Sequence, residues 1–175
     1  NINKILVVNL AFIGDVILST PVIRALKERY PHASISMLTI PLTAPIAELN
    51  PYIDKVLVYD KKGQHKGLLG GWEIVKAIKK EKFDMAICMN FAVRGAILTW
   101  LAGINHRIGY DAQHGKIFLT NAIKASREVV QHETLNHMMV LKPLGCNITD
   151  DKIEIAVPEN ILNETIRKTK FDRSK

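Results

Sequence analysis

The sequence predicts an α/β fold with a doubly wound, mostly parallel sheet. Apolar runs rich in strand-forming residues alternate with segments whose apolar residues recur at helical spacing. The first run, residues 5–9, has no polar residues alternating with its apolar ones, as expected for a central strand covered on both faces. Strands that alternate with helices at this spacing are typical of parallel sheets with right-handed crossovers.

The predicted elements follow this alternation along the chain. Strands are expected at residues 5–9, 34–40, 55–59, 84–89, 106–109, 116–119 and 153–157. Helices are expected at residues 16–30, 43–49, 72–81, 93–102, 131 or 132–144, and 158–170. Pro31 ends the first helix, and Gly145 stands just past the end of the fifth. In the 72–81 helix, the spacing favours side chains that face the core or bury their stems at Trp72, Val75, Ile78 and Lys79.

Length and composition indicate one ordinary globular domain. The chain has 175 residues, of which 47% are hydrophobic and 23% are charged. Its formal net charge of +7 favours an anionic partner, whether a phosphorylated substrate, a membrane surface or nucleic acid. With two cysteines, of which Cys88 sits in an apolar run, we expect a buried thiol and a reducing cytoplasm rather than a disulfide scaffold. No segment approaches the roughly 18 apolar residues of a membrane span.

The turns that follow the strands are the candidate binding sites, because ligands of open α/β sheets bind at the carboxyl ends of the strands. The turn after the first strand holds one glycine where the dinucleotide-binding pattern G-x-G-x-x-G needs three. The second predicted strand ends without the acidic residue that would hold a ribose, and the sequence contains no P-loop pattern. These patterns argue against an NAD-dependent or ATP-hydrolysing enzyme, and no cofactor is expected.

Gly14 and Asp15 stand at the mouth of the first strand–helix turn. Glycine permits a tight turn or a left-handed backbone there. Asp15 has two interpretations: a capping or first-turn carboxylate favoured by the helix dipole, or a general base that accepts a proton from a hydroxyl. Asn9, at the end of the first strand, is expected either to line a pocket or to satisfy backbone groups of the turn.

Basic side chains gather after the third and fourth strands. The residues that could bind an anionic group are Lys61, Lys62, His65 and Lys66 in a Gly-punctuated loop, and Arg94 after the fourth strand. The alternatives are a solvated basic loop and an arginine on a helix surface. Arg107 is expected to be a structural partner within its own turn. A further group, Lys76, Lys79, Lys80 and Lys82, is expected on the wet face of a helix, where it could also approach an anionic membrane.

Two other classes of site are not expected. His132, Glu133 and His137 lack the spacing of a zinc site, and the chain has no Asp-x-Asp pair for a metal–diphosphate complex. Aromatic residues do not interleave with basic ones, so the chain lacks the stacking surface of a nucleic-acid binder.

Several spaced motifs resemble one family. Residues 4–27, KILVVNLAFIGDVILSTPVIRALK, resemble the opening of the family 9 glycosyltransferases, the lipopolysaccharide ADP-heptosyltransferases. Residues 107–110 resemble the Arg-x-Gly-aromatic segment of that family, and residues 132–145 resemble its His-to-Leu-Gly helix. The likeness runs from about residue 4 to residue 157.

The resemblance implies the N-terminal, Rossmann-like half of a GT-B glycosyltransferase. Residues 1–157 would form the acceptor-binding domain, and residues 158–175 would lead toward a nucleotide-sugar-binding domain, so this half alone is expected to be inactive. Asp15 would be the catalytic base, and the implied acceptor-binding residues are Asn9, Gly14, Lys61, Lys62, His65, Lys66 and Arg94. The reaction would transfer heptose from ADP-heptose, with inversion and without a metal, to a Kdo–lipid A acceptor.

The resemblance also implies a cytoplasmic enzyme, peripheral on the inner face of the inner membrane, with an anionic glycolipid as partner. Two alternatives remain open at this point. One is a non-catalytic α/β module that binds an anionic ligand or a partner protein, with Asp15 engaged in a cap hydrogen bond. The other is a relative that acts on another sugar or acceptor.

Overall fold

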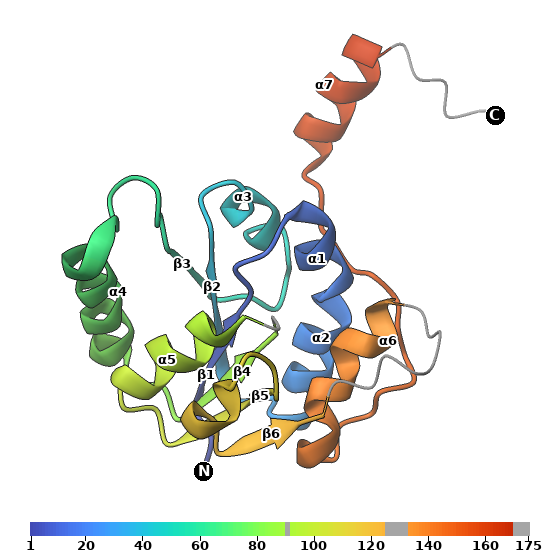
Figure 1. The fold of residues 1–175 in the computed structure, drawn as a ribbon. Coiled ribbons are helices and arrows are strands. Elements are labelled where there is room, and N and C mark those ends of the chain that lie inside the picture. Colours follow the sequence, from blue (N-terminus) through green and yellow to red (C-terminus); the bar gives the residue numbers. More distant parts are fainter. Residues whose placement is uncertain (90–91, 125–132, 170–175) are drawn as a thin grey trace.

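A computed structural model describes residues 1–89, 92–124 and 133–169 of the chain. Six strands form one sheet in the order β3-β2-β1-β4-β5-β6, and every pair of neighbours is parallel (Figure 1). The strands are β1 (Lys4–Val8), β2 (Ser34–Thr39), β3 (Lys55–Val58), β4 (Met85–Cys88), β5 (His106–Tyr110) and β6 (Asn121–Ile123). The predicted doubly wound parallel sheet is therefore confirmed.

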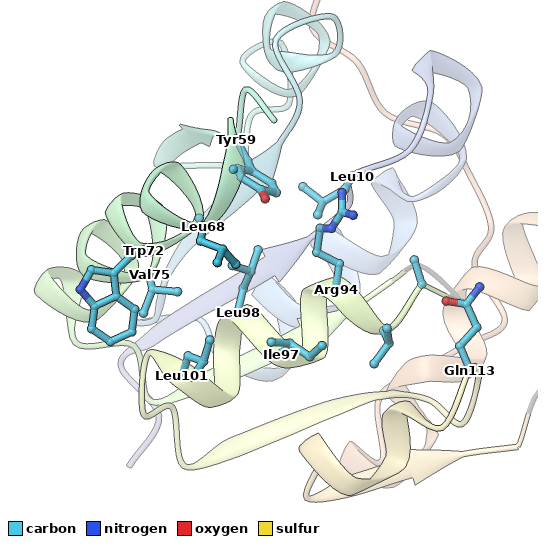
Figure 2. A pocket seen from close by; sticks show the side chains of 14 residues that line it. Leu10, Tyr59, Leu68, Trp72, Val75, Arg94, Ile97, Leu98, Leu101 and Gln113 are labelled. Atoms are coloured by element: carbon cyan, nitrogen blue, oxygen red, sulfur yellow. The ribbon is translucent and has the colours of Figure 1, made fainter. Parts of the chain in front are cut away.

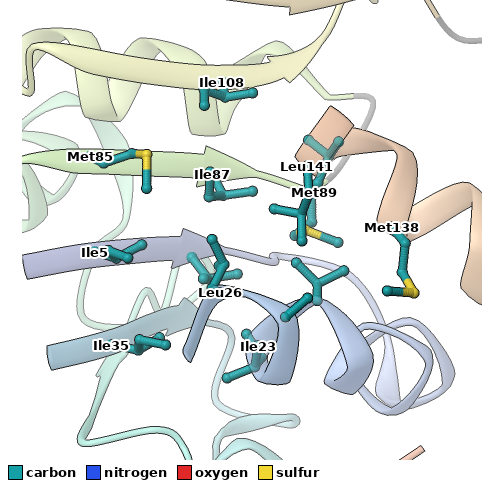
Figure 3. Packing of buried hydrophobic residues seen from close by; sticks show 14 of the residues in the cluster. Ile5, Ile23, Leu26, Ile35, Met85, Ile87, Met89, Ile108, Met138 and Leu141 are labelled. Atoms are coloured by element: carbon teal, nitrogen blue, oxygen red, sulfur yellow. The ribbon is translucent and has the colours of Figure 1, made fainter. Parts of the chain in front are cut away.

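Helices cover both faces of this sheet. On one face, α4 (Gly67–Glu81) and α5 (Val93–Leu101) pack against Leu6 and Val8 of β1. On the other, α2 (Thr20–Arg29), α6 (Glu133–Met138) and the 3-10 helix η2 (Met139–Leu144) pack against Ile5 and Val7 (Figure 3). Because successive strand residues point to opposite faces, the apolar run of β1 serves two separate cores. The remaining helices are α1 (Ile13–Leu18), α3 (Ala44–Ala47), η1 (Gly115–Phe118) and α7 (Glu159–Thr169).

The strand order reverses between β1 and β4, because the chain builds outward from β1 on one side and then continues on the other. Ligands of open α/β sheets bind at such a reversal, outside the carboxyl ends of the strands. Helix α5 lies very close to β1 here: a Cβ on Gly95 would stand 3.0 Å from Cγ1 of Val8. Glycine at this position therefore lets the first turn of α5, which carries Arg94, lie close against the sheet.

Cys88 ends β4 and is buried, as its apolar surroundings predict. Burial raises the pKa of its thiol to about 12, so the group stays protonated and unreactive near neutral pH. Within the described residues, no helix is both long enough and apolar enough to cross a bilayer.

Two predicted strands are wrong. Residues 115–118 form η1 instead of a strand, because pairing with β5 begins only at Thr120, whose hydroxyl accepts the amide hydrogen of Arg107 at 2.8 Å. Residues 153–157 lie outside the sheet, since their polar groups bind to helices. The Glu154 amide donates to the Thr20 hydroxyl at 3.1 Å, and the Glu154 carboxylate forms an ion pair with Arg24 at 3.4 Å.

The predicted helix at 16–30 is two helices, α1 and α2, which meet at Ser19. Pro21 has no amide hydrogen to donate to the carbonyl of Ile17, and the Thr20 hydroxyl donates to that carbonyl instead, at 2.8 Å. Helix 131–144 is similarly divided into α6 and η2, with Pro143 inside η2, although Gly145 does end it in a left-handed conformation.

Helix α4 begins at Gly67, five positions before the predicted start. Its buried side chains are Ile74, Val75 and Ile78. Trp72 is exposed, contrary to prediction, whereas Lys79 is exposed as expected for the wet face of the helix. Residues two apart on a helix point to nearly opposite sides, so Trp72 and Ile74 cannot both face the core.

The remaining predictions concern His132, the Asn90–Phe91 part of the turn after β4, and the tail at 171–175, which lie outside the described residues.

Candidate functional site

The turn between β1 and α1 is held by Asn9, whose side chain is completely buried. Its amide nitrogen donates to the Ser19 hydroxyl at 3.2 Å and to the Asp15 carbonyl at 3.3 Å, and its side-chain oxygen accepts from the Ala11 amide at 3.2 Å. The second interpretation of Asn9 therefore fits the structure: it satisfies polar groups of the turn. Whether Asn9 also contacts an acceptor, as expected from the family resemblance, stays a prediction.

Asp15 is the third residue of α1, and Phe12 occupies the capping position of that helix. The Asp15 side chain is half-buried, and within the described part of the chain its carboxylate accepts no hydrogen bond and forms no ion pair. The structure therefore shows no capping by the Asp15 side chain, but Asp15 does lie in the first turn of α1, which is the first-turn alternative that the helix dipole favours. Gly14 beside it is exposed and helical, and a Cβ there would meet nothing within 4 Å, so the turn does not require the special backbone freedom of glycine.

Helix α6 lies beside α1 and brings the buried His137 near Asp15. The imidazole is 6% exposed, and its Nε2 has no hydrogen-bond partner among the described residues. Burial lowers the pKa of His137, while the negative charges of Glu133 and Asp15 act in the opposite direction. Sequence reasoning weighed this histidine only as a zinc ligand, and the signal it missed is the position of His137 among buried Thr134, Met138 and Leu141.

The basic loop after β3 has a defined conformation built on Asp60. The Asp60 carboxylate accepts hydrogen bonds from the amides of Gly63 at 2.9 Å and Gln64 at 3.2 Å, which hold the pKa of this carboxyl below its ordinary value. The Asp60 amide donates to Nδ1 of His65 at 3.0 Å, and the His65 amide donates back to the Asp60 carbonyl at 2.7 Å. Because Nδ1 of His65 accepts a hydrogen bond, its Nε2–H is left as the donor.

The loop and the start of α5 together enclose a cavity of about 550 Å³, which we call the basic pocket. Its lining residues are Tyr59, Lys61, Lys62, His65, Lys66, Gly67 and Arg94. All five candidate anion-binding residues that follow β3 and β4 thus meet at one cavity. Asp15 does not line it, but the turns after β1, β3 and β4 all lie at the carboxyl edge of the same sheet. Whether these residues bind an acceptor stays a prediction.

A second, larger cavity of about 730 Å³ continues from the basic pocket between α4 and α5 (Figure 2). We call it the apolar groove; it shares Tyr59, Gly67 and Arg94 with the basic pocket. The other residues of its wall are mainly apolar, among them Leu10, Leu68, Trp72, Ile97 and Leu101. Sequence reasoning missed this groove, although the pair Leu68–Leu69 directly after a basic loop was visible.

Gly70 sets how closely α4 approaches the basic loop. A Cβ at this position would stand 2.2 Å from the carbonyl carbon of His65, a distance that no side chain tolerates. The first turn of α4 can fold against the loop only with glycine at this position. The geometry of the basic pocket therefore depends on Gly70 as well as on Asp60.

Arg107 has the structural role that its turn suggests. Its Nε donates to the Phe118 carbonyl at 2.6 Å, and its Nη1 donates to the carbonyl of Ile104. In residues 1–89, 92–124 and 133–169, no three His, Cys, Asp or Glu side chains gather closely enough to hold a metal ion.

Comparison of the sequence with known proteins finds a family model and curated relatives that match it. A model of glycosyltransferase family 9 (heptosyltransferase) matches residues 72–174, more than half of the chain. Lipopolysaccharide heptosyltransferase 3 of Escherichia coli K12 is 31% identical over 148 residues, which cover 78% of this chain and 40% of that protein. The chain thus spans less than half the length of this relative.

Solved structures agree on the fold. A family 9 glycosyltransferase from Veillonella parvula superposes with a TM-score of 0.83 at 27% identity, over 97% of this chain and 51% of that one. ADP-heptose lipopolysaccharide heptosyltransferase II of Escherichia coli gives a TM-score of 0.74 at 18% identity, over 98% of this chain and 52% of that one. The expected fold, one half of a GT-B heptosyltransferase structure, is confirmed.

Proposed function

The chain belongs to glycosyltransferase family 9, and on that basis we propose that it is the acceptor-binding half of a heptosyltransferase. The complete enzyme would move heptose from ADP-heptose to an anionic inner-core acceptor of the Kdo–lipid A type. The observation that carries this proposal is the basic pocket, where four lysine and arginine side chains and His65 converge at the sheet edge that also holds Asp15.

Asp15 is the proposed general base. A sugar hydroxyl is a poor nucleophile at neutral pH, and a carboxylate within hydrogen-bond reach helps by accepting its proton. The acceptor oxygen then forms a bond to the anomeric carbon of the heptose while the bond from that carbon to the diphosphate breaks, on the opposite face, and ADP leaves. Asp15 suits this role because its carboxylate has no hydrogen-bond partner in the described structure, whereas Asn9 fixes the backbone that carries it.

The basic pocket is the proposed site for the carboxylate and phosphate groups of the acceptor. Arg94 can bind such a group in bidentate geometry, and Lys61, Lys62 and Lys66 add charge that draws it in. Asp60 is the acidic residue of this loop, and its carboxylate is turned toward the amides of Gly63 and Gln64. The pocket therefore presents mainly donors and positive charge.

The boundaries expected from the sequence belong to the same proposal. Residues 1–157 act as the acceptor-binding domain, and residues 158–175 lead toward the nucleotide-sugar-binding domain. In the family, groups that stabilise the leaving diphosphate would come from that second domain, as helix N-termini or cations. We place the complete enzyme at the cytoplasmic face of the inner membrane, where a lipid-linked acceptor is within reach.

The test is charge reversal in the complete protein that carries this chain, with a deacylated, water-soluble Kdo–phosphate acceptor. Lys61→Glu with Lys62→Glu is expected to raise the acceptor KM roughly tenfold or more, because charge-assisted hydrogen bonds are lost. The KM for ADP-heptose should change far less. The matched control, Lys142→Glu with Lys152→Glu, changes the net charge equally at exposed positions away from the pocket.

An unchanged acceptor KM in the pocket variant would remove the basic pocket from acceptor binding. Equal rises in the pocket variant and the control would point to net charge alone. The non-catalytic alternative requires that Asp15 act as a cap, and it also predicts no turnover by the complete protein with either substrate.

A further inference from the structure

Helix α4 presents an unusual surface beside the basic pocket. Leu68 and Leu69 are consecutive and 96% and 84% exposed, and Trp72, one turn later, is 50% exposed. Large apolar side chains exposed as a contiguous group mark an interaction site more often than a chance arrangement. The buried face of α4 already contains Ile74, Val75 and Ile78. The exposed side chains of Leu68, Leu69 and Trp72 are therefore not needed for the core.

The exposed face of α4 changes character along its length. Leu68, Trp72 and Lys76 follow one another at intervals of four residues, so they share one face of the helix, and Lys79 lies on the same side. Lys76, Lys79 and Lys80 are all exposed. We call Leu68, Leu69, Trp72, Lys76 and Lys79 the α4 face. It is apolar at the end near the basic pocket and cationic at the other end.

The apolar groove extends this surface toward α5. Figure 2 shows Leu68, Trp72 and Val75 on α4 across the groove from Leu98 and Leu101 on α5. Leu101 is itself 40% exposed. The exposed leucines thus border an open apolar channel rather than a closed core, and Arg94 and the lysines of the basic pocket stand at its mouth.

We propose that the α4 face and the apolar groove dock this chain onto the surface of an anionic lipid bilayer. The inference rests on the proposed function in one respect: it explains how an enzyme without a described membrane-spanning helix would meet a lipid-linked acceptor. Leucine side chains enter the boundary between headgroups and acyl chains, and tryptophan favours that boundary because its ring is apolar and its N–H is polar.

The positive charge around this surface favours an anionic bilayer over a second copy of the chain as its binding partner. Lys61, Lys62, Lys66 and Arg94 flank the apolar end of the surface, and Lys76 and Lys79 continue it. Each basic residue near an anionic membrane adds to its attraction. A second copy of the chain docked face to face would instead bring these cations against their own counterparts. Glu81, at the end of α4, does not cancel the charge, because it pairs with Lys55 and Lys4.

The experiment measures binding of the 175-residue chain to vesicles of phosphatidylcholine, with and without phosphatidylglycerol, by flotation. Binding is expected only with the anionic lipid. Leu68→Ser with Leu69→Ser should weaken it roughly tenfold or more, because two apolar side chains no longer enter the bilayer. Lys76→Glu with Lys79→Glu should also weaken it roughly tenfold or more.

The matched control is Ile153→Ser, a position 48% exposed in the segment that α2 holds on the opposite face of the sheet. It should bind as the unaltered chain does. Both leucines are nearly fully exposed, so their replacement is expected to leave the fold intact, which circular dichroism checks. Binding that survives the leucine replacement but not the lysine reversal would reduce the surface to simple electrostatics and overturn the proposal.

A spectroscopic readout separates docking from other occupants. In a Trp100→Phe background, Trp72 emission should shift to the blue on anionic vesicles and be quenched by lipids with brominated chains. The ring of Trp100 lies tilted against that of Phe118, with the ring centroids 5.3 Å apart, and Trp100 should respond less in a Trp72→Phe background. No vesicle binding, concentration-dependent dimerisation that the leucine replacement abolishes, or binding by this chain but not by the complete protein would each overturn the proposal.

These outcomes are independent of the proposed function. Vesicle binding needs neither Asp15 nor ADP-heptose, and the water-soluble acceptor in the kinetic test needs no bilayer. Loss of the docking surface with an intact basic pocket would leave the KM for the soluble acceptor unchanged. The converse result, intact docking with no effect of the pocket variant on that KM, would reject the proposed function alone.

Discussion

Asp15 and Asp60 each follow a strand at the same edge of the sheet, yet their carboxylates are used in opposite ways. The Asp60 carboxylate accepts two backbone hydrogen bonds and builds the loop that contains it. The Asp15 carboxylate accepts none within the described residues, and the backbone of its turn is held by the side chain of Asn9 instead. The Asp60 carboxylate thus holds the conformation of its loop, and the Asp15 carboxylate takes no part in holding its turn.

The comparison teaches how a candidate site can be fixed in place without using the carboxylate that is proposed as its base. A carboxylate that already accepts two amide hydrogen bonds is stabilised in its charged form and is a weaker proton acceptor. The low pKa of Asp60 reflects this. Transferring the structural task to a buried, neutral amide, Asn9, leaves Asp15 positioned but uncommitted. The basic loop uses the opposite solution, since its proposed binding groups are the lysines and its aspartate holds the loop conformation.

The same substitution at the two positions gives the largest expected contrast. In the complete enzyme, Asp15→Asn should lower kcat roughly 10²- to 10⁴-fold, because an amide cannot accept the proton of the attacking hydroxyl. Asp60→Asn keeps an acceptor oxygen for the loop and should leave kcat within a few-fold of normal. Steady-state kinetics with saturating ADP-heptose measures both. Near-normal turnover in Asp15→Asn would remove Asp15 from the role of base.

Adjacent glycines of α4 offer the next contrast and test the basic loop as a rigid unit. Gly70→Ala places a methyl group 2.2 Å from the backbone of His65, so it should destabilise the fold by about 1–3 kcal/mol or displace the loop. At Gly71 a Cβ meets nothing within 4 Å, and Gly71→Ala should stabilise the helix by about 0.5–1 kcal/mol. Urea unfolding measures both. If the two substitutions changed the free energy of unfolding equally, the basic loop would be able to move aside for a methyl group at position 70 without a cost in stability.

Much of the fold could be predicted from the sequence because burial on both faces leaves a strong pattern. The two central strands, β1 and β4, are mainly apolar runs, and all four inner strands lie close to their predicted bounds. The failures lie where tertiary hydrogen bonds override local pattern. Residues 153–157 look like a strand, but Thr20 and Arg24 engage this region at the surface of α2. Helix 16–30 is continuous in the sequence pattern, but Pro21 and the Thr20 hydroxyl divide it.

The candidate site was predictable in its charges but not in its apolar part. Lys61, Lys62 and Arg94 follow strand ends, so topology alone brings them to one edge. The apolar groove depends instead on where α4 begins and how it is rotated, and the sequence pattern misplaced Trp72 in the core. The part that Asn9 plays in the turn also needed coordinates, because only the structure shows which groups its side chain binds.

Removing the scaffold carboxylate is a smaller and more pointed test. Asp60→Ala makes the basic pocket more positive, so charge alone predicts tighter binding of an anionic acceptor. The loss of the two loop hydrogen bonds predicts the reverse, and we expect the acceptor KM to rise about fivefold because the disordered loop must be ordered on binding. A fall in KM would show that the lysines act as mobile charges and that the loop conformation is irrelevant.

The smallest effect reports on Asp15 without any substrate. The negative charge of Asp15 raises the pKa of His137 against the lowering by burial, so Asp15→Asn should lower the pKa of that imidazole further, and Asp60→Asn should leave it unchanged. Nuclear magnetic resonance titration measures this, with His137→Gln to assign the signal.

A folded pKa below the unfolded value of about 6.5 means that the unfolded state binds more protons, so stability is lost as pH falls from that value toward the folded pKa. In the Asp15→Asn variant, in which the folded pKa of His137 is lower still, this loss of stability should extend to lower pH values. An unchanged pKa of His137 in Asp15→Asn would mean that the Asp15 carboxylate lies too far from the imidazole to influence it, contrary to the structure.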